Sequence, residues 1–228
     1  MTFRSDINGL RAYAVMLVIL YHFGFSQVSG GFLGVDVFFV ISGYLMTGII
    51  LSRLNQHKFS LMAFYAARCR RIIPPLMMLC AILMLMGYFL MPPEEYQRMA
   101  EHAVSSLSFI SNVVYFKQGG YFDTGSVYKW LLHTWSLSVE WQFYLLLPLA
   151  LMFTARFLRQ QFAWAMGIAA LLSFGLVLAM VATNFHLTAS YYLLPTRAWE
   201  MLIGGLVYLA PQSKLSGQSW VPPVSILA

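Results

Sequence analysis

The sequence predicts an all-α protein, a polytopic transmembrane helical bundle. Of its 228 residues, 60% are hydrophobic and 10% are charged, and the mean hydropathy is +0.69. Soluble domains carry about a quarter charged residues, so this composition is typical of a chain that lies in lipid. Apolar runs recur along the chain at the length of about 20 residues that a helix needs to cross a bilayer. We therefore expect several membrane-spanning helices joined by short connections.

Six segments are expected to span the membrane: residues 8–26, 32–51, 72–91, 131–154, 162–182 and 190–210. Residues 103–116 are interrupted by serines and are too short to span, so we expect a short non-spanning or re-entrant helix packed in the bundle. The apolar tail after residue 220 stops as though another span had begun. Residues 1–228 are thus expected to be one unit, the apparently truncated amino-terminal part of a larger membrane domain.

The connections carry their own signals. Residues 52–71 contain arginines and a lysine, no acid, and several apolar side chains, a pattern typical of a cytosolic loop with a short interfacial amphipathic helix. Pro74 and Pro75 are expected to open the third span, because proline is tolerated in the first turn of a helix. Four small residues in the second span allow a neighbouring helix to approach closely: Gly34, Ser42, Gly43 and Gly48.

The distribution of cations predicts the orientation. If the amino terminus is cytoplasmic and residues 103–116 do not cross, the outer connections hold only Arg98, Lys117 and Lys129. Positive charge favours the cytoplasmic side, so this asymmetry supports six crossings. The cations then placed in the cytosol are Arg4, Arg53, Lys58, Arg68, Arg70, Arg71, Arg156, Arg159 and Lys214.

Ionisable side chains inside the expected spans are the candidates for function, because a bilayer interior makes them costly. Arg11 and His22 are almost three helical turns apart, on nearly one face and about 16 Å from each other along the axis. His133, Ser136 and Glu140 share one face of the fourth span. The complete set of candidates is Arg11, His22, Asp36, His133, Glu140, Arg197 and Glu200.

Structural interpretations compete with functional ones. Arg197 and Glu200, one turn apart, could form an ion pair that only holds helices in register. Asp36 could cap its helix, and the arginines near residue 70 could only anchor the topology against anionic lipid. For His22 a functional interpretation is favoured, because Arg11 lies on the same helix face and His133 and Glu140 lie on the fourth span. No residues have the spacing of a zinc site, so no metal is expected, and no nucleic acid partner is expected either.

Several stretches together resemble the integral-membrane acyltransferase-3 family. D-I-N-G-L-R-A-Y-A-V-M-L-V-I-L-Y-H is similar to its first-helix signature, a basic residue and a His separated by ten residues, here Arg11 and His22. F-Y-A-A-R-C-R-R-I-I-P-P resembles its cytosolic R-x-x-R motif, here Arg68 and Arg71. G-G-F-L-G-V-D-V-F-F-V-I-S-G-Y-L-M-T, L-L-H-T-W-S-L-S-V-E-W-Q-F-Y and L-P-T-R-A-W-E-M-L-I-G-G resemble later helices. The matches occur in order along nearly the whole chain.

The resemblance implies an enzyme of the bacterial inner, or cytoplasmic, membrane. Such an enzyme moves an acyl group, usually acetyl, from cytosolic acetyl-CoA to a sugar hydroxyl of an envelope polysaccharide or a lipid-linked glycan such as O-antigen. It binds acetyl-CoA as a donor substrate and needs no permanently bound cofactor. The motif of the fourth span has Glu140 followed by Trp141 where many members carry two acids, so only Glu140 corresponds to the family pattern.

The expected roles follow from the residue types. His22 would be the general base on the acceptor hydroxyl or a transient acyl carrier, because imidazole titrates near neutral pH. Glu140 would orient an imidazole, His22 or His133, or polarise the acceptor. Arg68 and Arg71 would hold CoA phosphates, with Arg11 steadying the donor. The remaining residues are expected to contact substrate: Asp36, Arg197 and Glu200.

Two rival interpretations remain open at this point. Charges inside a membrane suit a transporter or flippase of an envelope glycan equally well. The chain could also be an inactive, truncated fragment of an acyltransferase. Many transporters contain an inverted repeat, and the sequence shows none.

Overall fold

The computed structural model describes residues 5–119, 129–157, 161–184 and 187–210, and within these ranges every regular element is helical. This agrees with the predicted all-α membrane bundle. The elements are α1 (Ser5–His22), the 3-10 turns η1 (Ser26–Val28) and η2 (Gly31–Leu33), α2 (Gly34–Asn55), α3 (Leu61–Leu90), α4 (Pro93–Leu107), α5 (Ser111–Lys117), α6 (Thr134–Phe157), α7 (Phe162–Ala182), α8 (Leu187–Tyr192) and α9 (Leu194–Leu209).

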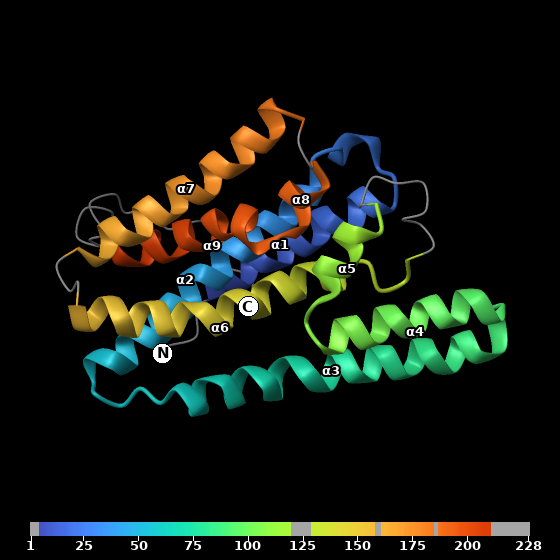
Figure 1. The fold of residues 1–228 in the computed structure, drawn as a ribbon, viewed down its shortest axis with the longest axis horizontal. Helices are drawn as coiled ribbons and strands as arrows, with labels where there is room; N and C mark the ends of the chain where they lie inside the picture. The colour runs from blue at the N-terminus through green and yellow to red at the C-terminus, as the bar shows by residue number, and fades with distance from the viewer. Residues whose placement is uncertain (1–4, 120–128, 158–160, 185–186, 211–228) are drawn as a thin grey trace.

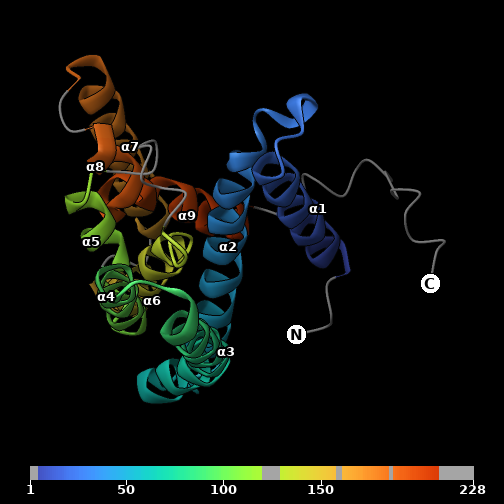
Figure 2. The same cartoon turned by 90° about the vertical axis from the view of Figure 1, so that its right-hand side faces the viewer.

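The long helices run roughly side by side along the longest axis of the molecule (Figure 1). Helix α2 is central, because it packs against α9, α1 and α6, while α7 covers α9. Helices α3 and α4 form an antiparallel pair along one side. Turned by 90°, α1 stands on the outer side of α2, away from α6 and α7 (Figure 2).

Within the described ranges, four helices are long and apolar enough to cross a membrane: Gly31–Asn55, Leu61–Leu90, Thr134–Thr154 and Phe162–Ala182. The other two expected spans correspond to α1, with 18 residues, and α9, with 16. Both are helical and carry charged side chains, and six crossings remain a prediction. Of the cations expected in the cytosol, Arg4, Arg159, Lys214 and the side chain of Arg156 lie outside the described residues, as does the apolar tail.

The first expected span ends earlier than residue 26. Helix α1 stops at His22, because Gly24 adopts a left-handed conformation with φ of 76°. The Phe25 amide donates to the Leu20 carbonyl at 3.2 Å and the Gly24 amide to the Tyr21 carbonyl at 3.0 Å. This pair of bonds is a Schellman motif, which glycine permits at no steric cost. His22 is therefore the last residue of α1.

Most of the connection expected at residues 52–71 is helical: its start belongs to α2 and its end to α3, so Pro74 and Pro75 do not open a helix. Helix α3 begins at Leu61, where the Ser60 hydroxyl accepts a bond from the Ala63 amide at 3.3 Å, and runs through both prolines for 30 residues. Each proline removes one helical N–H donor, but the surrounding turns continue. The predicted amphipathic segment and the third span are thus one element.

The sixth expected span is broken into α8 and α9. Leu193 is extended, with φ of −91° and ψ of 143°, two residues before Pro195. Pro195 has no N–H and its ring crowds the carbonyl four residues earlier, and here, unlike at Pro74 and Pro75, the helix is interrupted before the proline. The Tyr191 carbonyl is thereby released from helical pairing.

The segment expected to be one short internal helix forms the end of α4 and all of α5. Phe109, with φ of 55°, separates the two helices. Polar side chains bind this segment to α6: Ser111 Oγ lies 2.8 Å from Ser138 Oγ, and the Gln142 amide donates to Asn112 Oδ1 at 2.9 Å. Three of the serines that made the segment too polar for a span, Ser105, Ser106 and Ser111, are thus buried in the bundle, whereas Ser108 is exposed.

Glycines set the closest helix contacts. A Cβ at Gly43 would collide with the Met201 carbonyl, and a Cβ at Gly204 would collide with the Val40 carbonyl. Helices α2 and α9 therefore meet backbone to backbone, as small residues allow in membrane proteins. A Cβ at Gly34 would likewise collide with the Ala14 carbonyl of α1. The close approaches predicted for the second span at Gly34 and Gly43 are confirmed.

Candidate functional site

A cavity of about 580 Å³ lies between α1, α2, α3 and α6. It brings together Arg11, Arg68 and Arg71, the three residues expected to hold the donor. The Nε atoms of Arg11 and Arg68 are buried and have no hydrogen-bond partner among the described residues. A buried donor without a partner is costly, so the cavity is prepared for an anion or another acceptor.

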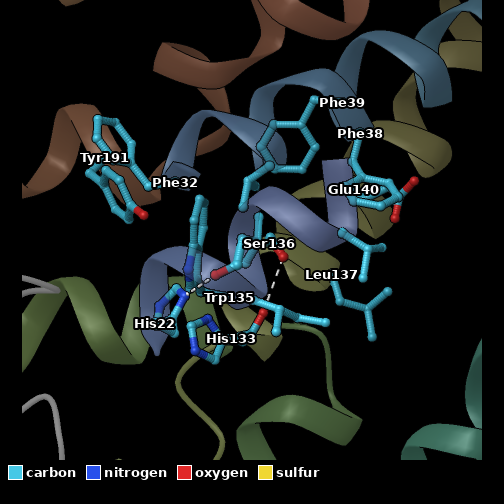
Figure 3. A pocket seen from close by; sticks show the side chains of 14 residues that line it. His22, Phe32, Phe38, Phe39, His133, Trp135, Ser136, Leu137, Glu140 and Tyr191 are labelled. Atoms are coloured by element: carbon cyan, nitrogen blue, oxygen red, sulfur yellow. Dashed lines mark hydrogen bonds between the residues drawn. The ribbon is translucent and has the colours of Figure 1, made fainter. Parts of the chain in front are cut away.

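A second cavity, of about 320 Å³, holds His22 and His133 (Figure 3). Their rings are nearly perpendicular, with centroids 4.6 Å apart, so the end of α1 meets the residue before α6. The His22 Nδ1 lies 2.7 Å from the Val18 carbonyl oxygen, which can only accept. Nδ1 therefore carries the proton, and the lone pair of the neutral ring is on Nε2.

The two cavities share one wall. Both are lined by Phe38, His133, Leu137 and Glu140. The face predicted for the fourth span is confirmed, since His133, Ser136 and Glu140 all line the histidine cavity. The structure thus connects the cation-lined cavity to the histidine pair through Glu140.

Two hydroxyl groups fix Glu140. Its Oε1 accepts hydrogen bonds from the Ser42 hydroxyl of α2 and the Tyr144 hydroxyl of α6. Reasoning from the sequence missed both residues as parts of the site. The position of Tyr144, four residues after Glu140 on the same helical face, could have revealed it; Ser42 had been noted only for its small size.

The Arg197 guanidinium lies between two acids. Its Nη1 lies 3.0 Å from Asp36 Oδ1 and 2.7 Å from Glu200 Oε1. The predicted pairing of Arg197 with Glu200 is confirmed, and Asp36 is a partner rather than a helix cap. Glu200 is 1% exposed, and its other oxygen, Oε2, has no hydrogen-bond partner among the described residues. A role of this ion-pair triad in contacting substrate remains a prediction.

Arg197 also connects the triad to the histidine cavity. Its Nε donates to the Tyr191 carbonyl at 2.9 Å, the carbonyl released by Pro195. The guanidinium lies 4.8 Å from the centroid of the Tyr191 ring and 5.7 Å from that of Trp135, and both rings line the histidine cavity. Tyr191 was not singled out from the sequence, because nothing in the chain pattern places it beside α6.

The fold and the site define a polytopic membrane protein with two adjacent cavities, one lined by three guanidinium groups and the other by two imidazoles. Over residues 4–228 the chain matches the family model described as an acyltransferase domain, and it belongs to that family. The membership predicted from the motifs is confirmed.

Curated relatives are similar over most of this chain. The O-acetyltransferase OatA of Staphylococcus aureus is 37% identical over 202 residues, 87% of this chain and 33% of the relative. The peptidoglycan O-acetyltransferase OatA of Listeria monocytogenes is 34% identical over 219 residues, 92% of this chain and 35% of the relative. A putative membrane-bound transacylase BcsY of Komagataeibacter xylinus is 33% identical over 213 residues, 93% of this chain and 53% of the relative.

The chain therefore spans about a third of the length of the two OatA relatives. No solved structure matches it.

Proposed function

We propose that this chain carries the amino-terminal part of a membrane O-acetyltransferase, which moves an acetyl group from cytosolic acetyl-CoA to a sugar hydroxyl of the bacterial cell envelope. The observation that carries the proposal is the junction of the two cavities at His133 and Glu140. One cavity offers positive charge to a phosphorylated donor and the other offers a base. This division suits a transferase more than a transporter.

The donor would bind in the cation-lined cavity. Guanidinium groups match phosphate oxygens in geometry and stay charged, and Arg68 and Arg71 come from one helix turn of α3. The buried Nε of Arg11, which also lines this cavity, offers a further N–H group for a hydrogen bond to the acetyl-CoA. When the chain lies in a bacterial inner membrane with its amino terminus on the cytosolic side, these residues lie toward the cytosol, where acetyl-CoA is available. The thioester arm would then extend along α1 toward His22.

Transfer would occur at the histidine pair. His22 Nε2 takes the proton of the acceptor hydroxyl as its oxygen attacks the thioester carbonyl, the C–S bond breaks, and the imidazolium returns the proton to the leaving thiolate. The alternative passes the acetyl group through an acyl-imidazole on His22 before the sugar attacks. His133, in ring contact with His22, and Glu140, held by two hydroxyls, would orient the imidazole or the acceptor.

The acceptor is proposed to be an envelope polysaccharide. One relative is named a peptidoglycan O-acetyltransferase, which favours peptidoglycan sugars over the O-antigen suggested by the motifs alone. A glycan flippase is the second candidate. The intramembrane charges favour it equally, but the family membership supports acyl transfer.

The test uses the full-length protein in proteoliposomes with radiolabelled acetyl-CoA and a peptidoglycan-derived disaccharide. We expect His22→Ala to abolish ester formation and Arg68→Ala/Arg71→Ala to weaken the affinity for CoA. His57→Asn and Arg98→Ala, at exposed positions away from both cavities, serve as matched controls. Normal acetylation by an inserted His22→Ala protein contradicts the role of His22, and glycan movement without ester formation favours the flippase.

A further inference from the structure

Much of the lining of the histidine cavity is aromatic. Phe32 from η2, Phe39 from α2, Trp135 from α6 and Tyr191 from α8 surround the space beside His22 (Figure 3). Besides the Trp135 indole N–H and the Tyr191 hydroxyl, the polar groups of the lining are few: Ser136, His22, His133 and Glu140. The cavity therefore has broad apolar surfaces and a narrow polar edge.

Tyr191 is the best anchored part of this wall. Arg197 holds it twice, through the bond from Nε to the Tyr191 carbonyl and through the guanidinium stacked 4.8 Å from its ring. The ring also packs against Trp135, with centroids 4.7 Å apart. Trp135 is 1% exposed and so supports the wall from behind, whereas Tyr191 is only half-buried. The orientation of Tyr191 is thus fixed before any ligand arrives.

A pyranose ring has the matching shape. Its axial C–H groups form an apolar face, while its hydroxyl groups form a polar rim, so it packs one face on an aromatic ring and extends the rim toward hydrogen-bonding groups. A volume of about 320 Å³ suits one sugar residue and is at the small end for ligand pockets.

We infer that Tyr191, supported by Trp135 and held by Arg197, stacks on one pyranose ring of the acceptor and directs its hydroxyl toward His22. This inference rests on the proposed acetyl transfer and adds the subsite in which the acceptor sugar lies. No Arg or Lys is among the described residues that line this cavity, so the phosphates of the donor have no partner here. A donor acyl chain is the competing occupant, because aliphatic side chains also line the cavity.

The binding test needs no donor. Full-length protein in detergent is titrated with methyl β-N-acetylglucosaminide, and with N-acetylglucosaminitol as an open-chain control, while tryptophan fluorescence is recorded. We expect the glycoside but not the open-chain sugar to bind. Tyr191→Leu should weaken binding about tenfold, as loss of one aromatic contact would, and Tyr191→Phe should bind like the wild type.

The kinetic test measures the KM for the acceptor. Tyr191→Leu should raise the KM for the glycoside acceptor about tenfold, and Tyr191→Phe should keep the wild-type KM. Phe32→Leu, at another ring of the lining that is not fully buried, is a second variant if Tyr191→Leu fails to insert. Tyr88→Leu, at an exposed tyrosine far from both cavities, is the matched control.

The outcomes separate the two proposals. Tyr191-dependent glycoside binding without any acetyl transfer supports the subsite and contradicts the acetyltransferase function. Acetyl transfer with an unchanged acceptor KM in both Leu variants overturns the subsite and leaves the function intact. A changed preference for longer acyl donors at constant acceptor KM assigns the aromatic wall to the acyl chain and also overturns the subsite.

Discussion

The ion-pair triad of Asp36, Arg197 and Glu200 predicts an unequal effect of two neutralising substitutions. In Arg197→Gln, both acids lose their cation, although Glu200 is 1% exposed and Asp36 is largely covered. Removing one partner of a buried ion pair costs about 3–5 kcal/mol, since the remaining charge stays buried. In Glu200→Gln, Arg197 keeps Asp36 at 3.0 Å and the partnerless Oε2 is replaced by a neutral amide group. We expect that change to cost about 1 kcal/mol or less.

The difference can be measured as equilibrium unfolding in mixed micelles. Cys80 is a buried free thiol, so a thiol-reactive dye reports unfolding of the bundle. Arg98→Gln, an exposed arginine substitution, is the control and should unfold like wild type. Equal destabilisation by Arg197→Gln and Glu200→Gln would refute the reasoning, because Glu200 would then contribute more than a surplus charge.

Three further predictions concern other parts of the molecule. Gly204→Ala should destabilise the bundle by about 1–3 kcal/mol or prevent its assembly, because the new methyl group meets the α2 backbone; Gly175→Ala, with open space around its Cβ, should be neutral in the same unfolding assay. Burial lowers the pKa of His102, so the folded state favours the neutral ring. The free energy of unfolding should therefore fall as the pH drops below about 6.5, by up to about 1.4 kcal/mol per pH unit. His102→Gln should flatten this dependence in melting curves recorded from pH 7.5 to 5. Tyr144→Phe removes one of the two hydroxyl groups that donate to Glu140 and should lower the rate of acetyl transfer about tenfold without changing CoA affinity. An unchanged rate in a steady-state assay would contradict this and show that the bond from Ser42 is enough to hold Glu140.

The sequence predicted the helical class because apolar runs of bilayer length need no tertiary information. The seventh helix was predicted to the residue, since Phe162–Ala182 is uninterrupted. The ends of other helices depended on local backbone choices that hydropathy does not report. Gly24 ended α1 early and Pro195 divided the last span, whereas Pro74 and Pro75 did not end α3.

The site was predictable where one helix carried both partners. Arg11 and His22, and His133 and Glu140, could each be placed by helical periodicity. The contact between His22 and His133 brings the end of α1 to the residue before α6, and the periodicity of a single helix could not predict it. The hydroxyl of Ser42 on Glu140 and the ring of Tyr191 beside Trp135 arise from the packing of distant helices, which no local pattern encodes.

Helix α3 carries the arginines and a long apolar segment on one continuous element. Its 30 residues extend about 45 Å, well beyond the roughly 30 Å hydrocarbon core. Pro74 and Pro75 leave the carbonyls of Arg70 and Arg71 without their helical N–H donors, so resistance to bending is lowest just after the arginines. The arginine-bearing end can therefore tilt relative to the apolar half of the same helix. The two prolines thus give one continuous helix a point of easier bending between its arginine-bearing part and its apolar part.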